Sequence, residues 1–282
     1  MKILLTGCRG QLGTAVKNSF TEHELTCTDF DTLDITSREA VLHFISKNRF
    51  DAVLNAAAYT QVDKAEEDPE KAFAVNCMGP ENLAYATREA GIPIVHISTD
   101  YVFDGLMGRS YSEDDIPNPA SVYGRSKLEG EKLVARLNPQ HYIVRTSWLY
   151  STVGQNFPKT MIALSKTRDE VRVVNDQSGS PTFAPHLARG LKDLLNSASA
   201  YGIRHMAGSG QSTWFELTEE LYKILGINAR VVPVSTSEFP RPAKRPPYSV
   251  LTSFQTPRIN LPPWREGLFE FAHEWQMIAQ PS

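Results

Sequence analysis

The chain has 282 residues, 41% of them hydrophobic, which is enough to bury a large core in one domain or in two joined lobes. Its 29 Lys and Arg against 32 Asp and Glu give a net charge of −3, which favours neither nucleic acid nor an anionic membrane as a partner. No apolar stretch approaches the ~18 residues of a membrane span, and no signal cleavage pattern is present. The three cysteines lack metal-ligand spacing, so we expect reduced thiols and a cytoplasmic protein.

Short apolar or β-branched runs alternate with helix-length segments through the first half of the chain. This alternation predicts right-handed βαβ units and an α/β fold of the Rossmann type, with a doubly wound parallel sheet. Ligands of such sheets bind at the carboxyl ends of the strands. The predicted strands are 2–6, 24–28, 52–55, 93–98 and 141–146.

The pattern loosens after Trp148, which suggests a smaller C-terminal substrate-binding lobe. We assign residues 1–149 and roughly 170–200 to an NAD(P)-binding domain, and 150–169 and roughly 201–282 to the lobe. The segment Glu238 to Pro247 carries four prolines, which exclude a regular helix and predict an ordered loop or a flexible flap. The elements expected in this half are helices over 156–167, 184–196 and 213–225 and a strand over 171–174.

A glycine-rich loop, Gly7-Cys8-Arg9-Gly10-Gln11-Leu12-Gly13, follows the first predicted strand directly. Glycines at this spacing allow a tight turn and a close approach of backbone N–H groups to a pyrophosphate at a helix N-terminus. The loop therefore predicts NADH or NADPH as cofactor. Asp29 ends the second strand, where a carboxylate accepts hydrogen bonds from ribose hydroxyls, whereas Arg9 can pair with a 2′-phosphate. The two residues favour different cofactors, and the choice stays open.

Tyr123 and Lys127 stand four residues apart at the start of a helical run, so their side chains share one face. An ammonium beside the phenol should lower the tyrosine pKa and make Tyr123 a proton donor. This spacing also occurs by chance on exposed helices. Thr99, at the end of the fourth strand, can present its hydroxyl to the same substrate oxygen, and the three residues together predict one catalytic site.

Several motifs resemble the dTDP-4-dehydrorhamnose reductase family, within the extended short-chain dehydrogenase/reductase superfamily. The resemblance runs from residue 2 to about 182 and continues in Arg-Pro and Ser-x-Leu elements near 245–251. It implies a two-lobed fold and NAD(P)H-dependent reduction of the C4 ketone of dTDP-4-dehydro-L-rhamnose, which supplies a surface polysaccharide precursor. The motifs are Asn55-Ala-Ala-Ala-Tyr-Thr60 with Val62-Asp-Lys-Ala-Glu66, Ser98-Thr-Asp-Tyr-Val-Phe103, Val122-Tyr-Gly124, Arg145-Thr-Ser-Trp148, and Val174-Asn-Asp-Gln177 with Pro181-Thr182.

The resemblance also implies roles for individual residues. Tyr123 would donate the proton, Lys127 would bind ribose, and Thr99 would hydrogen bond the substrate. Trp148 could equally belong to the core, and the cations Arg241, Lys244 and Arg245 could form either a pyrophosphate site or a solvated loop. The predicted substrate contacts are Thr99, Asp100, Tyr123, Trp148, Asn156 and Arg245. The predicted cofactor contacts are Gly7, Arg9, Gly10, Gln11, Leu12, Gly13, Asp29, Asp34, Ile35, Ala56, Ala57, Ala58, Tyr59, Thr60, Tyr123 and Lys127.

Some relatives dimerise around a metal held partly by an acidic residue in the helix after the glycine loop. Here that helix contains Thr14-Ala15-Val16-Lys17, without a carboxylate, so we predict no metal and leave monomer and homodimer open. A dehydratase on the same fold would carry Thr-Asp-Glu where this chain has Thr99-Asp100-Tyr101. An epimerase, a reductase of another 4-keto sugar and a non-catalytic cofactor-binding subunit remain alternatives.

Overall fold

The main sheet of the structure consists of six parallel strands. The computed structural model describes residues 1–197 and 199–279. The strands are β1 (Lys2–Thr6), β2 (Glu24–Thr28), β3 (Ala52–Asn55), β4 (Ile94–Thr99), β5 (His141–Thr146) and β10 (Gly202–His205). Their order is β10-β5-β4-β3-β1-β2, with every neighbouring pair parallel. The chain runs from β1 to β2 and then crosses to β3 on the other side of β1, which places the ligand crevice outside the ends of β1 and β3.

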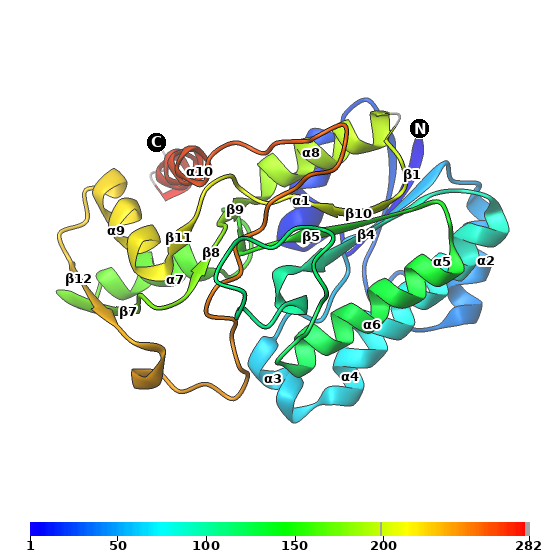
Figure 1. The fold of residues 1–282 in the computed structure, drawn as a ribbon. Coiled ribbons are helices and arrows are strands. Elements are labelled where there is room, and N and C mark those ends of the chain that lie inside the picture. Colours follow the sequence, from blue (N-terminus) through cyan, green and yellow to red (C-terminus); the bar gives the residue numbers. More distant parts are fainter. Residues whose placement is uncertain (198, 280–282) are drawn as a thin grey trace.

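Helices cover both faces of this sheet (Figure 1). One face carries α1 (Gln11–Ser19) and α8 (Ala184–Asn196), and the other carries α2 (Arg38–Asn48), α5 (Gly79–Ala90) and α6 (Val122–Leu137). Alternate residues of β1 divide between the two layers, because successive strand side chains point to opposite faces. Ile3 and Leu5 pack in the cluster that includes Leu187 of α8, whereas Leu4 packs in the cluster that includes Val134 of α6.

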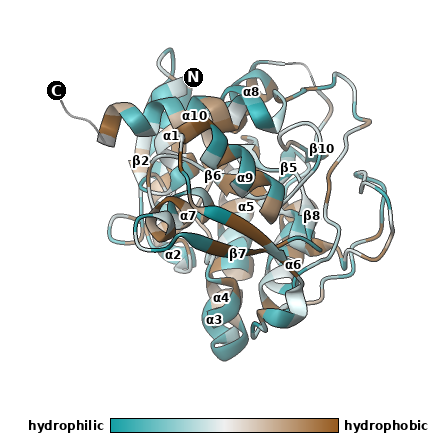
Figure 2. Cartoon of the chain, turned by 90° about the vertical axis from the view of Figure 1, so that its left-hand side faces the viewer, coloured by the Kyte–Doolittle hydropathy of each residue, from teal (hydrophilic) through white to brown (hydrophobic). Residues whose placement is uncertain are grey.

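A second hydrophobic core lies at the other end of the molecule. Here β7 (Glu170–Val174) pairs in parallel with β12 (Arg230–Val234), and α7 (Phe157–Ser165), α9 (Trp214–Leu225) and α10 (Trp264–Ala279) pack around them. Strand β7 alternates exposed and buried side chains, and Val171 and Val173 are buried in this core. Figure 2 shows hydrophilic and hydrophobic residues alternating along this strand. Two short pairs border this lobe: β6 (Leu149–Tyr150) with β9 (Thr182–Phe183), and β8 (Ser178–Gly179) with β11 (Ser212–Thr213).

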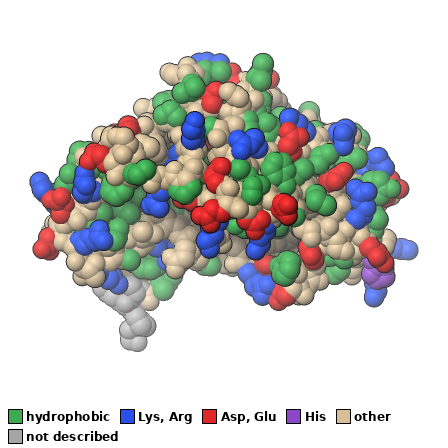
Figure 3. Space-filling view, turned by 90° about the horizontal axis from the view of Figure 1, so that it is seen from below, with side chains coloured by type: hydrophobic (Ala, Val, Ile, Leu, Met, Phe, Trp, Pro, Cys, Tyr) green, Lys and Arg blue, Asp and Glu red, His purple; other side chains and the backbone are tan. Residues whose placement is uncertain are grey.

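The remaining helical segments are short. They are α3 (Val62–Glu67), α4 (Pro69–Phe73), a π-helical turn (Ala74–Met78) and 3₁₀ turns at Asp100–Val102 and Thr236–Glu238. In the described parts of the chain, no helix is both long and apolar enough to cross a membrane. Acidic and basic side chains are interspersed on the face seen from below (Figure 3).

The five strands predicted in the first half are confirmed to within one residue at either end. The helices predicted over 156–167, 184–196 and 213–225 correspond to α7, α8 and α9, and the proline-rich segment contains no regular helix beyond Glu238. The predicted division of the chain differs from the packing in two places. Strand β7 packs in the second core although we assigned 170–200 to the cofactor domain, and β10 joins the main sheet although we assigned it to the lobe.

Candidate active site

The glycine loop lies where β1 and β3 end. At two of its glycines, any side chain would clash with neighbouring backbone atoms. Gly7 has a φ of +68°, and a Cβ there would lie 2.6 Å from the Ala57 nitrogen. A Cβ on Gly13 would lie 2.3 Å from the Gly7 carbonyl oxygen. Gly10 precedes α1, and no side chain caps the first N–H groups of that helix. The loop therefore presents free backbone donors at a helix N-terminus, which fits a dinucleotide pyrophosphate.

Charged side chains gather beside this loop, at the end of β2. The Arg9 backbone N–H donates to Asp29 Oδ2 at 3.1 Å, and its guanidinium donates to Asp31 at 3.1 and 2.5 Å. Partial burial opposes ionisation of Asp29, but the backbone N–H groups of Phe30 and Arg9 and the Arg9 guanidinium outweigh it and lower the Asp29 pKa. Sequence reasoning missed Asp31, whose ion pair with Arg9 spans 22 positions.

The other predicted cofactor residues fall into two groups. Gln11 and Leu12 line one cavity of about 700 Å³ together with small residues that follow β3, whereas Ile35 is buried in the core between the sheet and α2. Asp34 Oδ1 accepts hydrogen bonds from the backbone and hydroxyl of Thr36 and so shapes the turn before α2. The small or polar residues from the β3 end that line the cavity are Ala56, Ala58 and Thr60.

Thr99, Tyr123 and Lys127 line the same cavity as the glycine loop. Helix α6 approaches the end of β4 closely because Gly124 has no side chain, and a Cβ there would lie 2.2 Å from the Tyr101 carbonyl oxygen. The Ser121 hydroxyl caps the helix by accepting from the Gly124 N–H at 3.1 Å. The structure therefore brings together the three residues that the sequence proposed as catalytic.

The pKa shifts at this site differ from our prediction. Burial raises the pKa of Tyr123 to about 12, opposed only in part by its hydrogen bond with Thr99. Burial lowers the pKa of Lys127 to about 8, and its Nζ donates to the Ile97 carbonyl oxygen at 2.6 Å. The expected low pKa of Tyr123 is therefore wrong, because loss of hydration of the phenolate dominates and raises the pKa.

Asp100 is buried beside Thr99, and both of its carboxylate oxygens accept hydrogen bonds from hydroxyl groups of the protein. Oδ1 accepts from Thr99 at 3.0 Å, and Oδ2 accepts from Ser147 at 3.2 Å and from Ser249 at 2.6 Å. Burial raises the Asp100 pKa to about 6, although these hydroxyls oppose the shift. Asp100 lines the same cavity as Thr99, and its hydrogen bonds connect β4, β5 and the C-terminal segment, so its predicted contact with the sugar stays a prediction.

Aromatic residues separate this cavity from a larger one. The Trp148 ring stacks on the parallel ring of Trp214 at a centroid distance of 3.4 Å, and it packs against Gly179, where a Cβ would approach the indole to 2.4 Å. Trp148 has a φ of +47°, uncommon for a non-glycine residue, so its placement is held by the packing around it. Phe157 also packs against Trp214, with ring centroids 4.4 Å apart. Trp148 also lines the smaller cavity and so remains accessible to a ligand there.

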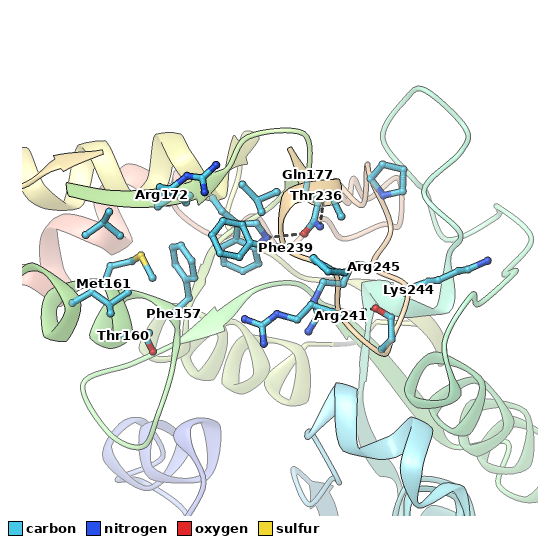
Figure 4. Close-up of a pocket in the computed structure, with 18 of the residues that line it drawn as sticks. Phe157, Thr160, Met161, Arg172, Gln177, Thr236, Phe239, Arg241, Lys244 and Arg245 are labelled. Carbon is cyan, nitrogen blue, oxygen red and sulfur yellow. Dashed lines mark hydrogen bonds between the residues drawn. The ribbon is translucent and has the colours of Figure 1, made fainter. Parts of the chain in front are cut away.

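The larger cavity has a volume of about 1120 Å³ and lies between α7, β7 and residues 236–247 (Figure 4). Its apolar wall includes Phe157, Phe239 and Trp214, and its cations are Arg168, Arg172, Arg241, Lys244 and Arg245. Phe157, Trp214 and Arg245 line both cavities, so the two adjoin.

Arg245, our predicted pyrophosphate contact, already has a carboxylate partner. Its guanidinium donates to Asp63 at 3.0 and 2.8 Å, and this pair joins the proline-rich segment to α3. Hydrogen bonding from Arg245 lowers the Asp63 pKa. The sequence places Asp63 in a family motif but does not reveal that it pairs with Arg245, and it gives no signal that Trp214 stacks on Trp148, because each contact joins residues far apart in the chain.

Asn156 links the two lobes at the cofactor loop. Its Nδ2 donates to Gln11 Oε1 at 2.9 Å, while its Oδ1 accepts from the Lys159 N–H at 3.1 Å and caps α7. A predicted substrate residue and a predicted cofactor residue are therefore in direct contact.

Metal-ligand side chains also gather away from these cavities. His186 of α8 and Glu266 and Glu270 of α10 each place one ligand atom within 4.8 Å of the others. The first turn of α1 contributes no acidic residue. The absence of a bound metal stays a prediction.

A family model described as the RmlD substrate binding domain matches residues 1–277. The chain belongs to this family. A dTDP-4-dehydrorhamnose reductase from Sinorhizobium fredii is 42% identical over 281 residues, which cover 95% of each chain. The crystal structure of a dTDP-4-dehydrorhamnose reductase from Clostridium acetobutylicum superposes with a TM-score of 0.96 at 45% identity, covering 98% of this chain and 100% of the other. That of the Bacillus anthracis enzyme in complex with NADP superposes with a TM-score of 0.93 at 38% identity, covering 97% and 99%.

Proposed function

We propose that this protein reduces the C4 ketone of a nucleotide-linked 4-keto-6-deoxy sugar with NADH or NADPH, converting dTDP-4-dehydro-L-rhamnose to dTDP-L-rhamnose for surface polysaccharide synthesis. One observation carries the proposal: Thr99, Tyr123 and Lys127 share a cavity with the glycine loop, and this cavity adjoins a larger one with aromatic and cationic walls. The names of its relatives give independent support, since they are reductases of this sugar.

The bound nicotinamide supplies the hydride to the ketone carbon. Tyr123 donates its phenolic proton to the ketone oxygen, so that an alkoxide charge does not accumulate. A phenol with a pKa of about 12 still donates readily to an alkoxide, which is far more basic, and it stays protonated until the reaction needs it. Thr99 orients the same oxygen. Lys127 binds the nicotinamide ribose and, in its charged form, stabilises the phenolate left on Tyr123 until solvent reprotonates it.

The larger cavity accommodates the nucleotide in this proposal. A flat base can stack on its aromatic residues, and a pyrophosphate can bind the cations of the proline-rich segment. Arg245 is placed to contact the pyrophosphate only by sharing its guanidinium between phosphate and Asp63. The six-stranded domain then holds the cofactor, and the lobe built around β7 and α9 holds the nucleotide sugar.

The proposal is tested by following the oxidation of NADH and NADPH with dTDP-4-dehydro-L-rhamnose, beside GDP- and UDP-linked 4-keto sugars, and identifying the product by NMR. We expect dTDP-L-rhamnose, and turnover at least about tenfold faster than with the other nucleotides, because the fit of one methyl group or neutral base contact gives a difference of this size. Cofactor binding without turnover of any sugar would indicate a non-catalytic subunit. Interconversion of epimers without net cofactor oxidation would indicate an epimerase.

A further inference from the structure

We propose that Asp31 weakens the binding of NADPH relative to NADH by holding the Arg9 guanidinium away from a 2′-phosphate. This inference rests on the proposed function, because it concerns the cofactor that the glycine loop binds. It names a residue that sets cofactor preference and explains how Asp29 and Arg9, which favour different cofactors, act together.

The adenosine ribose has a defined place in this fold. Thr28, the last residue of β2, pairs with Thr6 of β1, and the Cys8 N–H donates to the Thr28 carbonyl oxygen at 3.1 Å. Asp29 therefore emerges directly beside the glycine loop, at the position where a carboxylate contacts ribose hydroxyls and a nearby arginine contacts a 2′-phosphate.

Arg9 is held at this place by two carboxylates. Its backbone N–H is bound to Asp29, which fixes the start of the side chain, and its Nε lies 3.5 Å from Asp29 Oδ2. Both terminal nitrogens donate to the two oxygens of Asp31, the geometry in which a guanidinium and a carboxylate fit best. Asp31 thus engages the paired terminal N–H groups that would otherwise grip a 2′-phosphate, and Nε faces Asp29, so a phosphate has to compete with both carboxylates for Arg9.

The local charge adds to this effect. Asp29, Asp31 and Arg9 together carry one net negative charge, so a 2′-phosphate must displace a carboxylate from Arg9 and then lie close to two carboxylates. Ribose hydroxyls require no such exchange, since they donate to Asp29. Arg9 and Asp31 are exposed, with 61% and 59% of their side chains accessible, so the discrimination is moderate and screened by salt.

The Asp31 side chain can be changed without dismantling the turn. The turn is closed by the Thr32 and Leu33 N–H groups, which donate to the Asp29 carbonyl oxygen at 2.9 and 2.8 Å, and by the Asp29 N–H, which donates to the Thr32 hydroxyl at 2.7 Å. None of these bonds uses the Asp31 carboxylate. Asp31→Asn therefore removes the charge and leaves the backbone that positions Asp29.

The experiment measures dissociation constants of NADH and NADPH by calorimetric titration in the absence of sugar. Asp31→Asn should tighten NADPH binding roughly fivefold to tenfold at low salt, with less gain at high salt, and change NADH binding less than about twofold. Most of the gain should be lost when Arg9→Ala is added, because only the smaller part that comes from relieved repulsion between Asp31 and the phosphate does not act through Arg9. Glu89→Gln is the matched control, since Glu89 forms an exposed pair with Arg88 on α5.

Two outcomes overturn the inference: NADPH binding that Asp31→Asn leaves unchanged, and equal changes for both cofactors. Failure of the wild-type protein to bind either dinucleotide would instead overturn the proposed function. The two failures are therefore distinguishable in the same titration.

Discussion

The Ser249 hydroxyl donates a 2.6 Å hydrogen bond to the buried carboxylate of Asp100 and so ties the C-terminal segment to the end of β4. The Asp100 pKa is about 6, above the value of about 3.9 expected in the unfolded chain. The native state therefore holds the proton more tightly, and this group costs stability as pH rises from about 4 to about 6.

Ser249→Ala should increase that cost, because the ionised carboxylate loses a donor. We expect a loss of about 1–3 kcal/mol in the free energy of unfolding at about pH 8 and a clearly smaller loss at about pH 4.5. Urea denaturation at the two pH values measures both. Ser249→Thr keeps the hydroxyl and should recover most of the stability, and a loss that is equal at both pH values would contradict the assignment.

Deprotonation of Lys127 should lower kcat/KM at high pH and so produce a basic limb in its pH profile. Burial lowers its pKa to about 8, so its charged form, present below that value, is lost as pH rises through it. We expect kcat/KM to fall above about pH 8, and we expect the limb to disappear in Lys127→Met together with most of the activity. Lys132→Met, which removes an exposed ammonium from the same helix, should keep the limb.

Gly179 should be essential for the placement of Trp148, because a Cβ at Gly179 would lie 2.4 Å from the indole. Gly179→Ala should raise the KM for the nucleotide sugar by about tenfold, the effect of losing one good contact, and leave the dissociation constant of NADH within about twofold. Tryptophan fluorescence should change in parallel, because the stack with Trp214 is disturbed. An unchanged KM with altered fluorescence would exclude Trp148 as a sugar contact.

Arg245→Ala should raise the KM for the nucleotide sugar by roughly tenfold to a hundredfold without changing the affinity for NADH. Asp63→Asn is the informative companion, since it releases Arg245 from its carboxylate and should leave the KM unchanged or lower it. Steady-state kinetics at low and high salt measure both, and the penalty of Arg245→Ala should shrink as salt rises. If both variants raised the KM equally, the ion pair would serve only to hold the segment in place.

The sequence predicts the first half of the fold because each strand there is a short apolar run followed by a turn and a helix. Strand β10 was missed since Gly-Ile-Arg-His contains a single aliphatic residue. Its polar residues are buried by partners distant in sequence: Arg204 donates to Gln255 at 2.7 Å, and the His205 N–H donates to Glu113 at 3.0 Å. Such compensation cannot be recognised in a local pattern.

For the candidate active site, the sequence likewise identifies individual residues but not their burial or their partners. Helical spacing places Tyr123 and Lys127 on one face, but it does not reveal that Gly124 lets α6 pack against Tyr101, which buries both side chains and sets their pKa values. Likewise, Arg9 and Asp29 were identified by their place in a motif. The partners that modify them, Asp31 for Arg9 and Asp63 for Arg245, are found only in the folded chain.

The central claim is that Tyr123 donates the proton in the reduction of dTDP-4-dehydro-L-rhamnose, and the kcat of Tyr123→Phe tests it most directly. Removing only the hydroxyl should lower kcat by about 100-fold or more while the dissociation constant of NADH stays nearly unchanged. Tyr142→Phe, which removes a buried hydroxyl bonded to the Ser199 carbonyl oxygen, controls for any loss of stability and should keep wild-type turnover. A Tyr123→Phe variant that retains more than about half of the wild-type kcat would contradict the account, because a positioned general acid contributes far more than this.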